Sequence, residues 1–349
     1  MSRGLSRGDL LAALTVVIIW GLNFVVMKRA LSAVSPMMLG ALRFALASLP
    51  LLWFIPRPRT SWGFIVSYGV LQGLGQFGLL FTALHFGMPS GLASTVLQAQ
   101  VLFTVLLAVP VLGERARLHH GLGLLIAAAG LGLIAASHGN GPREMTLLGF
   151  VLTLAAALSW AGSNLLVRLM GRSATPIDPF QFIVWSSAVS VLPFLALAIG
   201  LDGVEASWYS VAAMGVSEWA AVAYLSLLAT LVGYSLWMRL LQRHAAGRIA
   251  PFSLLVPVVG LWAGWFFLSE QLNLAQWSGV GLVLAGLLVN QFGGSLRPAW
   301  CVGRRARALA EPADQSTLAP CTAQTSEPHP RTAIGDRKPD FRREKPPGL

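Results

Sequence analysis

The chain has 349 residues, of which 55% are hydrophobic and only 11% charged, against about 25% charged residues in ordinary globular domains. Together with a mean hydropathy of +0.66, this composition excludes a soluble globular protein and predicts a polytopic membrane protein. The net charge of +11 does not indicate nucleic-acid binding, because nine of the 25 Lys and Arg lie at or beyond Arg304 and no basic helix with interleaved aromatics occurs.

Apolar runs of membrane-spanning length recur along the chain and predict an all-α protein with ten transmembrane helices. They lie at about 10–27, 37–55, 62–84, 91–112, 121–136, 147–167, 180–201, 219–241, 249–268 and 277–292. The first run follows Arg3 and Arg7 but is too long for the apolar region of a signal peptide, so we interpret it as an uncleaved span.

The distribution of basic residues between the loops predicts the orientation. With the N-terminus in the cytoplasm, eleven basic residues fall in inner loops and three in outer loops, which predicts that both termini are cytoplasmic. The inner residues are Arg3, Arg7, Arg57, Arg59, Arg115, Arg117, Arg168, Arg172, Arg239, Arg243 and Arg248, and the outer ones are Lys28, Arg29 and Arg143.

An internal repeat relates the first five predicted spans to the last five. The first span contains Trp20 and Asn23, and the sixth span contains Trp160, Ser163 and Asn164 at corresponding positions. LeuGlyGlu at 112–114 corresponds to LeuSerGlu at 268–270, and each Glu is followed by glycines at +9 and +16. Because five is odd, the two halves must be inserted in opposite senses, as in many secondary transporters.

The predicted domains are therefore a first repeat at 8–139, a second repeat at 145–295 and a tail at 298–349. The tail is rich in Pro, Thr, Ala, Arg and Glu and lacks apolar periodicity, so we expect it to be disordered and cytoplasmic. Both cysteines, Cys301 and Cys321, lie in it, so neither a disulfide framework nor a CxxC metal site is expected.

Several glycine motifs lie inside the predicted spans. Residues 73–78 match GxGxxG, but a dinucleotide site needs a strand before the motif, and this one lies within a transmembrane run. We interpret it as a helix-packing surface, like the GxxxG pairs at 69–73 and 260–264.

Arg43 is the one charged residue predicted to lie well inside a span, where a charge costs about 2.5 kcal/mol or more. It either serves helix packing, with its head reaching the interface, or lines a cavity. Glu114 and Glu270 end the fourth and ninth spans, where a carboxylate opposes the helix dipole, and structural pairing with a cation is favoured. No span carries a deep carboxylate for a proton relay, which leaves His85, Glu114 and Glu270 as weak alternatives.

Neutral polar and aromatic residues on both halves suit a site for a small polar solute, although each one alone favours an interhelical hydrogen bond. Pro251 and Pro257 predict local unwinding in the ninth span. The candidate substrate-binding residues are Trp20, Asn23, Arg43, Gln76, Gln98, Gln100, Trp160, Asn164 and Pro257. The sequence contains no catalytic motif and no spaced metal-ligand set, so no enzyme activity, cofactor or metal is expected.

The sequence resembles the EamA family of the drug/metabolite transporter superfamily from about residue 8 to 295. The similarity is carried by IleTrpGlyLeuAsnPhe at 19–24, LeuArgPhe at 42–44, PheGlyMetProSerGlyLeuAlaSerThrValLeuGlnAlaGln at 86–100, GlyGluArg at 113–115, GlyPheValLeuThrLeuAlaAlaAlaLeuSerTrp at 149–160 and SerLeuLeuValProValValGly at 253–260.

The resemblance implies a bacterial inner-membrane transporter with two inverted five-helix repeats. It most resembles members that export cysteine and O-acetylserine, which implies export of such small amino-acid metabolites by alternating access. The alternative is a broader amino-acid, amine or drug exporter of the same superfamily. A membrane enzyme would need a nucleophile–base pair or a metal cluster, and the sequence shows neither. A channel would need a continuous polar stripe on several helices, and the polar residues are too sparse for one. The expected partners are a small-molecule substrate and the lipid bilayer, with a homodimer allowed and no nucleic acid.

Overall fold

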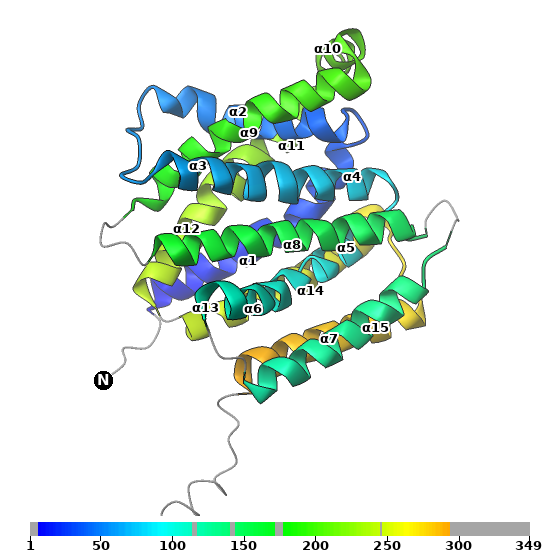
Figure 1. Ribbon diagram of the computed structural model, residues 1–349. Coiled ribbons are helices and arrows are strands. Elements are labelled where there is room, and N and C mark those ends of the chain that lie inside the picture. The colour runs from blue at the N-terminus through cyan, green and yellow to red at the C-terminus, as the bar shows by residue number, and fades with distance from the viewer. Residues whose placement is uncertain (1–5, 114–116, 140–143, 172–176, 245, 294–349) are drawn as a thin grey trace, which may run out of the picture. The chain divides into compact units, whose positions relative to one another are not determined.

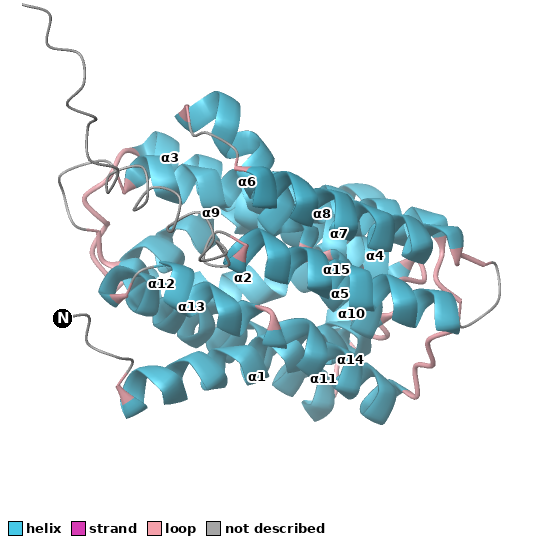
Figure 2. Ribbon diagram, turned by 90° about the horizontal axis from the view of Figure 1, so that it is seen from below, coloured by secondary structure: helices cyan, strands magenta, loops and turns pink. Residues whose placement is uncertain are grey.

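The structure, a computed structural model, describes residues 6–113, 117–139, 144–171, 177–244 and 246–293, and within these ranges every regular element is a helix (Figures 1 and 2). The helical segments are α1 (Arg7–Ala30), α2 (Pro36–Leu52), α3 (Trp62–Tyr68), η1 (Gly69–Gly78), α4 (Leu79–His85), α5 (Ser90–Val96), α6 (Ala99–Leu112), α7 (Leu118–Ala136), α8 (Leu147–Met170), α9 (Pro179–Asp202), α10 (Val204–Ala212), α11 (Val216–Ala223), η2 (Tyr224–Val232), α12 (Gly233–Arg243), α13 (Ala246–Ser253), α14 (Leu255–Leu268) and α15 (Leu274–Phe292). Glu114 and the predicted tail lie outside the described residues.

Nine helices in the described ranges are long and apolar enough to cross a membrane, which confirms the all-α membrane class. They coincide with nine of the predicted spans. The second predicted span is Pro36–Leu52, a helix of only 17 residues, which is the lower limit for crossing a hydrocarbon core of roughly 30 Å. The count of ten spans therefore stays a prediction.

Most of the spanning helices begin at a residue whose side chain caps the helix N-terminus. Ser35 and Asp178 accept hydrogen bonds from the first turns of α2 and α9, and each is followed by a proline at the first helical position. Ser6 and Asp9 form a capping box at α1. These local signals place the helix starts within the loops that the sequence predicted.

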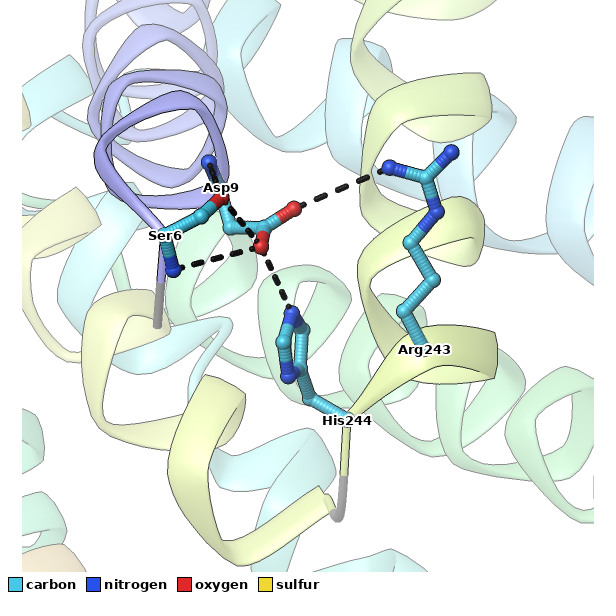
Figure 3. Close-up of polar contacts among 4 residues, drawn as sticks. All are labelled: Ser6, Asp9, Arg243 and His244. Carbon is cyan, nitrogen blue, oxygen red and sulfur yellow. Dashed lines mark hydrogen bonds and ion pairs between the residues drawn. The ribbon is translucent and has the colours of Figure 1, made fainter. Parts of the chain in front are cut away.

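The carboxylate of Asp9 also ties the start of α1 to the end of α12 (Figure 3). Its Oδ2 accepts from Ser6 Oγ at 2.6 Å and lies 3.0 Å from Nε2 of His244, and its Oδ1 lies 3.8 Å from Nη1 of Arg243. The Arg243 side chain is 71% exposed, so its ion pair contributes little, whereas the side chains of Asp9 and His244 are largely buried.

Helices α7 and α15 lie side by side and are joined by four glycines (Figure 1). A Cβ on Gly123 would lie 2.6 Å from the carbonyl oxygen of Gly286, and one on Gly130 would lie 2.6 Å from that of Gly279. The helices are therefore antiparallel and in backbone contact along both pairs. These are the glycines that the repeat places at +9 and +16, so packing explains their spacing.

Glycines of the GxGxxG stretch also serve packing, as predicted. A Cβ on Gly73 would meet the hydroxyl of Ser190 in α9, and one on Gly75 would meet the hydroxyl of Ser159 in α8. The stretch lies in η1, a π-helical segment in the middle of the Trp62–His85 span. It has no preceding strand within the described residues, which is the context that a dinucleotide site would need.

Two spans change their helical geometry near the middle of the bundle. The π-helical segments η1 and η2 lie in the third and eighth predicted spans, which occupy equivalent places in the two predicted repeats. In η2 the hydroxyl of Thr230 donates to the carbonyl of Leu225, five residues earlier, at 2.8 Å. Such π-helical insertions are rare and occur frequently at functional sites.

Two further spans are interrupted. The span Ser90–Leu112 breaks between α5 and α6 at Leu97 and Gln98, and the ninth predicted span breaks between α13 and α14 at Leu254. Gln98 Nε2 donates to the carbonyl of Ser253 at 2.7 Å, so it satisfies a backbone acceptor beside the second break. The break lies between Pro251 and Pro257, and Pro257 has no N–H for the carbonyl of Ser253 four residues earlier, which agrees with the predicted local unwinding.

Candidate functional site

Arg43 is buried in the middle of α2, with 1% of its surface exposed. Its Nε donates to Thr230 Oγ1 in η2 at 3.0 Å, and its Cζ lies 3.9 Å from the centre of the Phe77 ring. Its Nη1 lies 3.9 Å from Sδ of Met27. Among the described residues no carboxylate pairs with this guanidinium, which is held by a hydroxyl, a sulfur and aromatic faces.

Asn23 lies next to the same methionine. Its Nδ2 contacts Met27 Sδ at 3.6 Å, while its Oδ1 is buried and has no hydrogen-bond partner. Leaving a buried acceptor unpaired costs about 1–3 kcal/mol. Arg43, which has no carboxylate partner among the described residues, and Asn23, whose acceptor is unpaired, therefore contact the same sulfur atom of Met27.

A second polar group links η1 to α8 and α12. Gln72 Nε2 donates to the hydroxyl of Tyr234 at 2.8 Å and also to Oε1 of Gln76. Gln72 Oε1 in turn accepts from the hydroxyl of Ser163. All four side chains are buried or nearly so, and they form one connected hydrogen-bond network within the bundle.

Residues of both polar groups line one small cavity. Its volume is about 10 Å³, which is roughly the space that one water molecule needs. Gln72 and Tyr234 line it together with Thr230 and Phe77, the partners of Arg43. This space has no room for an amino acid. A larger cavity of about 440 Å³ lies near the end of α1 and is lined by residues of α1 and α11 and by Tyr224 at the start of η2.

Trp20 lies beside this centre. Its ring packs on Tyr234 and Trp237 with ring centres 5.0 and 5.5 Å apart, and its Nε1 donates to the carbonyl of Ala229 in η2 at 3.1 Å. The predicted residues Trp20, Asn23, Arg43 and Gln76 thus gather around η1 and η2.

The other predicted site residues lie apart from that centre. Asn164 Nδ2 donates to Gln100 Oε1 at 2.7 Å, which joins α8 to α6. Gln98 is engaged at the helix breaks, and Pro257 is buried in the first turn of α14. Trp160 is only partly buried, and its backbone carbonyl accepts from Ser163.

Two residues at the centre, Thr230 and Tyr234, did not stand out in the sequence. A signal exists, because Ser226, Thr230 and Tyr234 recur every four residues in an otherwise apolar span and so share one helical face. Gln72 and Gln76 show the same spacing in the third span. Polar residues at i and i+4 in equivalent spans of both repeats would have pointed to this centre.

Spanning helices around an enclosed polar centre define a polytopic helical membrane protein. The chain belongs to the EamA-like transporter family, which it matches over residues 7–136 and 147–291. This confirms the resemblance found in the sequence.

Relatives and a solved structure agree with this assignment. The chain is 40% identical over 299 residues to a probable amino-acid metabolite efflux pump of Escherichia coli, covering 86% of this chain and all of the relative. It is 40% identical over 294 residues to a pump of the same description from Salmonella typhimurium, covering 84% and 98%. A solved crystal structure with 20% identity aligns with a TM-score of 0.53 and covers 83% of this chain and all of its own, which supports the fold.

Proposed function

We propose that the chain is an inner-membrane secondary transporter that exports small zwitterionic amino-acid metabolites such as cysteine and O-acetylserine. The relatives' description as probable amino-acid metabolite efflux pumps supports the class of solute. The observation that carries the proposal is Arg43, a fully buried guanidinium for which the described part of the chain supplies no carboxylate. A substrate carboxylate would supply the missing charge.

The ammonium group of such a substrate needs acceptors, and Asn23 is the first of them. Its Oδ1 is unpaired, and its Nδ2 contacts the same Met27 sulfur as Nη1 of Arg43. The faces of Trp20 and Tyr234 provide an aromatic surface for a cation nearby. Each end of a zwitterion thus has a complementary group.

The tight packing around Arg43 supports transport by alternating access. The cavity of about 10 Å³ beside Thr230 and Phe77 cannot hold an amino acid, so the helices around it have to move apart before a substrate carboxylate can reach Arg43. We assign the moving units to two inverted repeats at 8–139 and 145–295. The family matches at 7–136 and 147–291 and the paired helix breaks at Gln98 and Leu254 support this division.

Efflux of labelled substrate tests the function. Cells that express the chain should release labelled cysteine and O-acetylserine faster than cells with an empty vector, and unlabelled substrate should compete. The runner-up, a broader exporter of amino acids, amines or drugs, predicts comparable efflux of aromatic amino acids and of organic cations without a carboxylate. No efflux of any carboxylate-bearing solute would contradict the proposal.

The charge distribution predicts how reporter fusions behave. Fusions after Arg59, Arg117 and Arg172 should report a cytoplasmic location, and fusions near Asp202 should report the periplasm. The reason is that eleven basic loop residues fall on the proposed inner side and three on the outer. A periplasmic signal at Arg172 would contradict the inverted repeat.

Asn23→Ala is expected to weaken the apparent substrate affinity by about 1–3 kcal/mol, the cost of an unpaired polar group. The variant removes the acceptor and leaves Arg43 in place, so transport at saturating substrate should fall less than affinity. The concentration dependence of uptake into inverted vesicles measures both quantities. An unchanged affinity would show that Oδ1 does not receive the ammonium.

A further inference from the structure

The turn between α4 and α5 is held at both of its ends by charged side chains from elsewhere in the chain. Lys28, in the last turn of α1, donates from Nζ to the carbonyls of Leu84 at 2.5 Å and Met88 at 3.2 Å. The carbonyls at the end of a helix carry partial negative charge, so a cation is favoured there. Lys28 thus fastens the end of α4 to α1.

Glu270 holds the other end of the turn. Its Oε1 accepts from the backbone N–H of Ser90 at 2.7 Å, and its Oε2 accepts from that of Gly91 at 2.9 Å. These are the first amides of the span Ser90–Leu112, which no carbonyl of their own helix can satisfy. Glu270 follows α14 in the chain, so the contact joins segments of the first and second predicted repeats.

The backbone conformation of Ser269 and the hydrogen bond of Glu270 N–H position this carboxylate. Ser269 has a φ of +51°, the one positive value for a residue other than glycine among the described residues. This conformation is costly for a residue with a Cβ and persists only where its surroundings enforce it. The N–H of Glu270 bonds to the carbonyl of Gly264 at 3.1 Å, and a Cβ on Gly264 would collide with the carboxylate.

The polar contacts of α1 differ in what they join. The Asp9 contacts with α12 and the Trp20 bond to η2 hold α1 to the eighth predicted span. The contacts of Lys28 and Glu270 instead reach across to the turn between α4 and α5. We propose that the bonds of Lys28 and Glu270 to this turn act together as a closing contact at the end of the bundle where α1 ends. The closing contact separates once per transport cycle. This inference rests on the proposed function of alternating access.

The closing contact predicts a change in the accessibility of the buried face of α5. Gly91 and Thr95 lie four residues apart on that face, and Thr95 is fully buried with a hydroxyl that has no hydrogen-bond partner. Thr95→Cys therefore removes no hydrogen bond. In the full chain with Cys301→Ser and Cys321→Ser, it is a single thiol reporter beneath the contact.

The test measures the rate at which a charged methanethiosulfonate reagent labels this thiol in the purified protein. Glu270→Gln should raise the rate at least tenfold, because it removes the charge that binds the two amides. Ser90→Pro should do the same, because it removes one of these donors at a helix position where proline is favoured. Pro89 already has φ −64° and ψ 139°, which a following proline accepts.

Glu218→Gln is the matched control. Its carboxylate also caps a helix, accepting from Gly215 N–H at 2.9 Å, but within its own α11. The labelling rate should stay unchanged there. Unchanged rates in folded Glu270→Gln and Ser90→Pro would overturn the proposal. Loss of folded protein in both variants, with Glu218→Gln intact, would overturn it too, since the contact would then serve stability alone. Labelling needs no substrate, so faster labelling in a chain that exports no amino acid would contradict only the proposed solute.

Discussion

Gly130→Val is expected to destabilise the protein by about 3 kcal/mol and to lower its Tm by roughly 5–10 °C. A Cβ at this position would lie 2.6 Å from the carbonyl oxygen of Gly279 and 2.8 Å from Cβ of Leu282. The obstruction is partly backbone, which cannot rotate away as a side chain does. Helix α15 would have to move away from α7 along the whole contact, which also includes Gly123 and Gly286.

The same helix provides the control. Gly132 lies two residues further along α7, and a Cβ there would meet nothing within 4 Å. Gly132→Val changes the helix propensity in the same way but leaves the interface intact, so its Tm should stay within about 1–2 °C of the parent. Thermal unfolding of both purified variants, followed by gel filtration, separates the two effects. Equal stability of both variants would show that the glycine contact does not hold α7 to α15.

The helical architecture was predictable because apolar length and loop charge are local properties of the sequence. The spacing of Gly123 and Gly130 was visible as a repeat, but its cause was not. Only the antiparallel placement of α7 on α15 explains why Gly279 and Gly286 recur at the same spacing. The π-helical segments η1 and η2 were not predicted, since composition does not distinguish a π-helical turn from an α-helical one.

The candidate site was predictable in part for a similar reason. A charge inside a span is conspicuous, so Arg43 stood out, and Asn23 shares a helical face with Trp20. The pairing of Arg43 with Thr230 was not inferred, because Thr230 is 187 positions away in the sequence and its spacing with Ser226 and Tyr234 does not show which helix it faces. Gln98 was included as a candidate ligand although an interhelical hydrogen bond was favoured for each amide alone, and its Nε2 donates to the carbonyl of Ser253 at a helix break. Neutral amides serve equally well in both roles, so their residue type does not decide between them.

Arg43→Lys is expected to reduce efflux per folded molecule at least tenfold. This corresponds to a loss of about 1.4 kcal/mol in the stabilisation of the bound substrate or of the transition state for transport. Lysine keeps the charge but loses the planar fork that binds a carboxylate with two parallel hydrogen bonds. It also loses the 3.0 Å hydrogen bond from Nε to Thr230 Oγ1, which fixes the orientation of the guanidinium. Efflux of labelled cysteine, divided by the amount of folded protein from gel filtration, measures the effect.

Arg29→Lys is the control for the exchange itself. Arg29 also lies on a spanning helix, but its side chain is exposed and its Nη2 reaches the carbonyl of Phe267 only at 3.4 Å. Its replacement should leave efflux per folded molecule unchanged, because no buried fork is lost. A parallel loss in both variants would point to a general effect of the substitution and not to the site.

Arg43→Ala decides between the two roles that the sequence left open for this residue. If Arg43 serves packing, the variant lowers the amount of folded protein, because Phe77 and Thr230 lose their partner, and the surviving molecules transport normally. If Arg43 receives the substrate carboxylate, the surviving molecules fail as well, because no other cation is buried at the centre among the described residues. Normal efflux per folded molecule in Arg43→Ala would therefore remove Arg43 from the site. The zwitterion would then need another counter-charge for its carboxylate, and the proposed class of substrate would lose its main support.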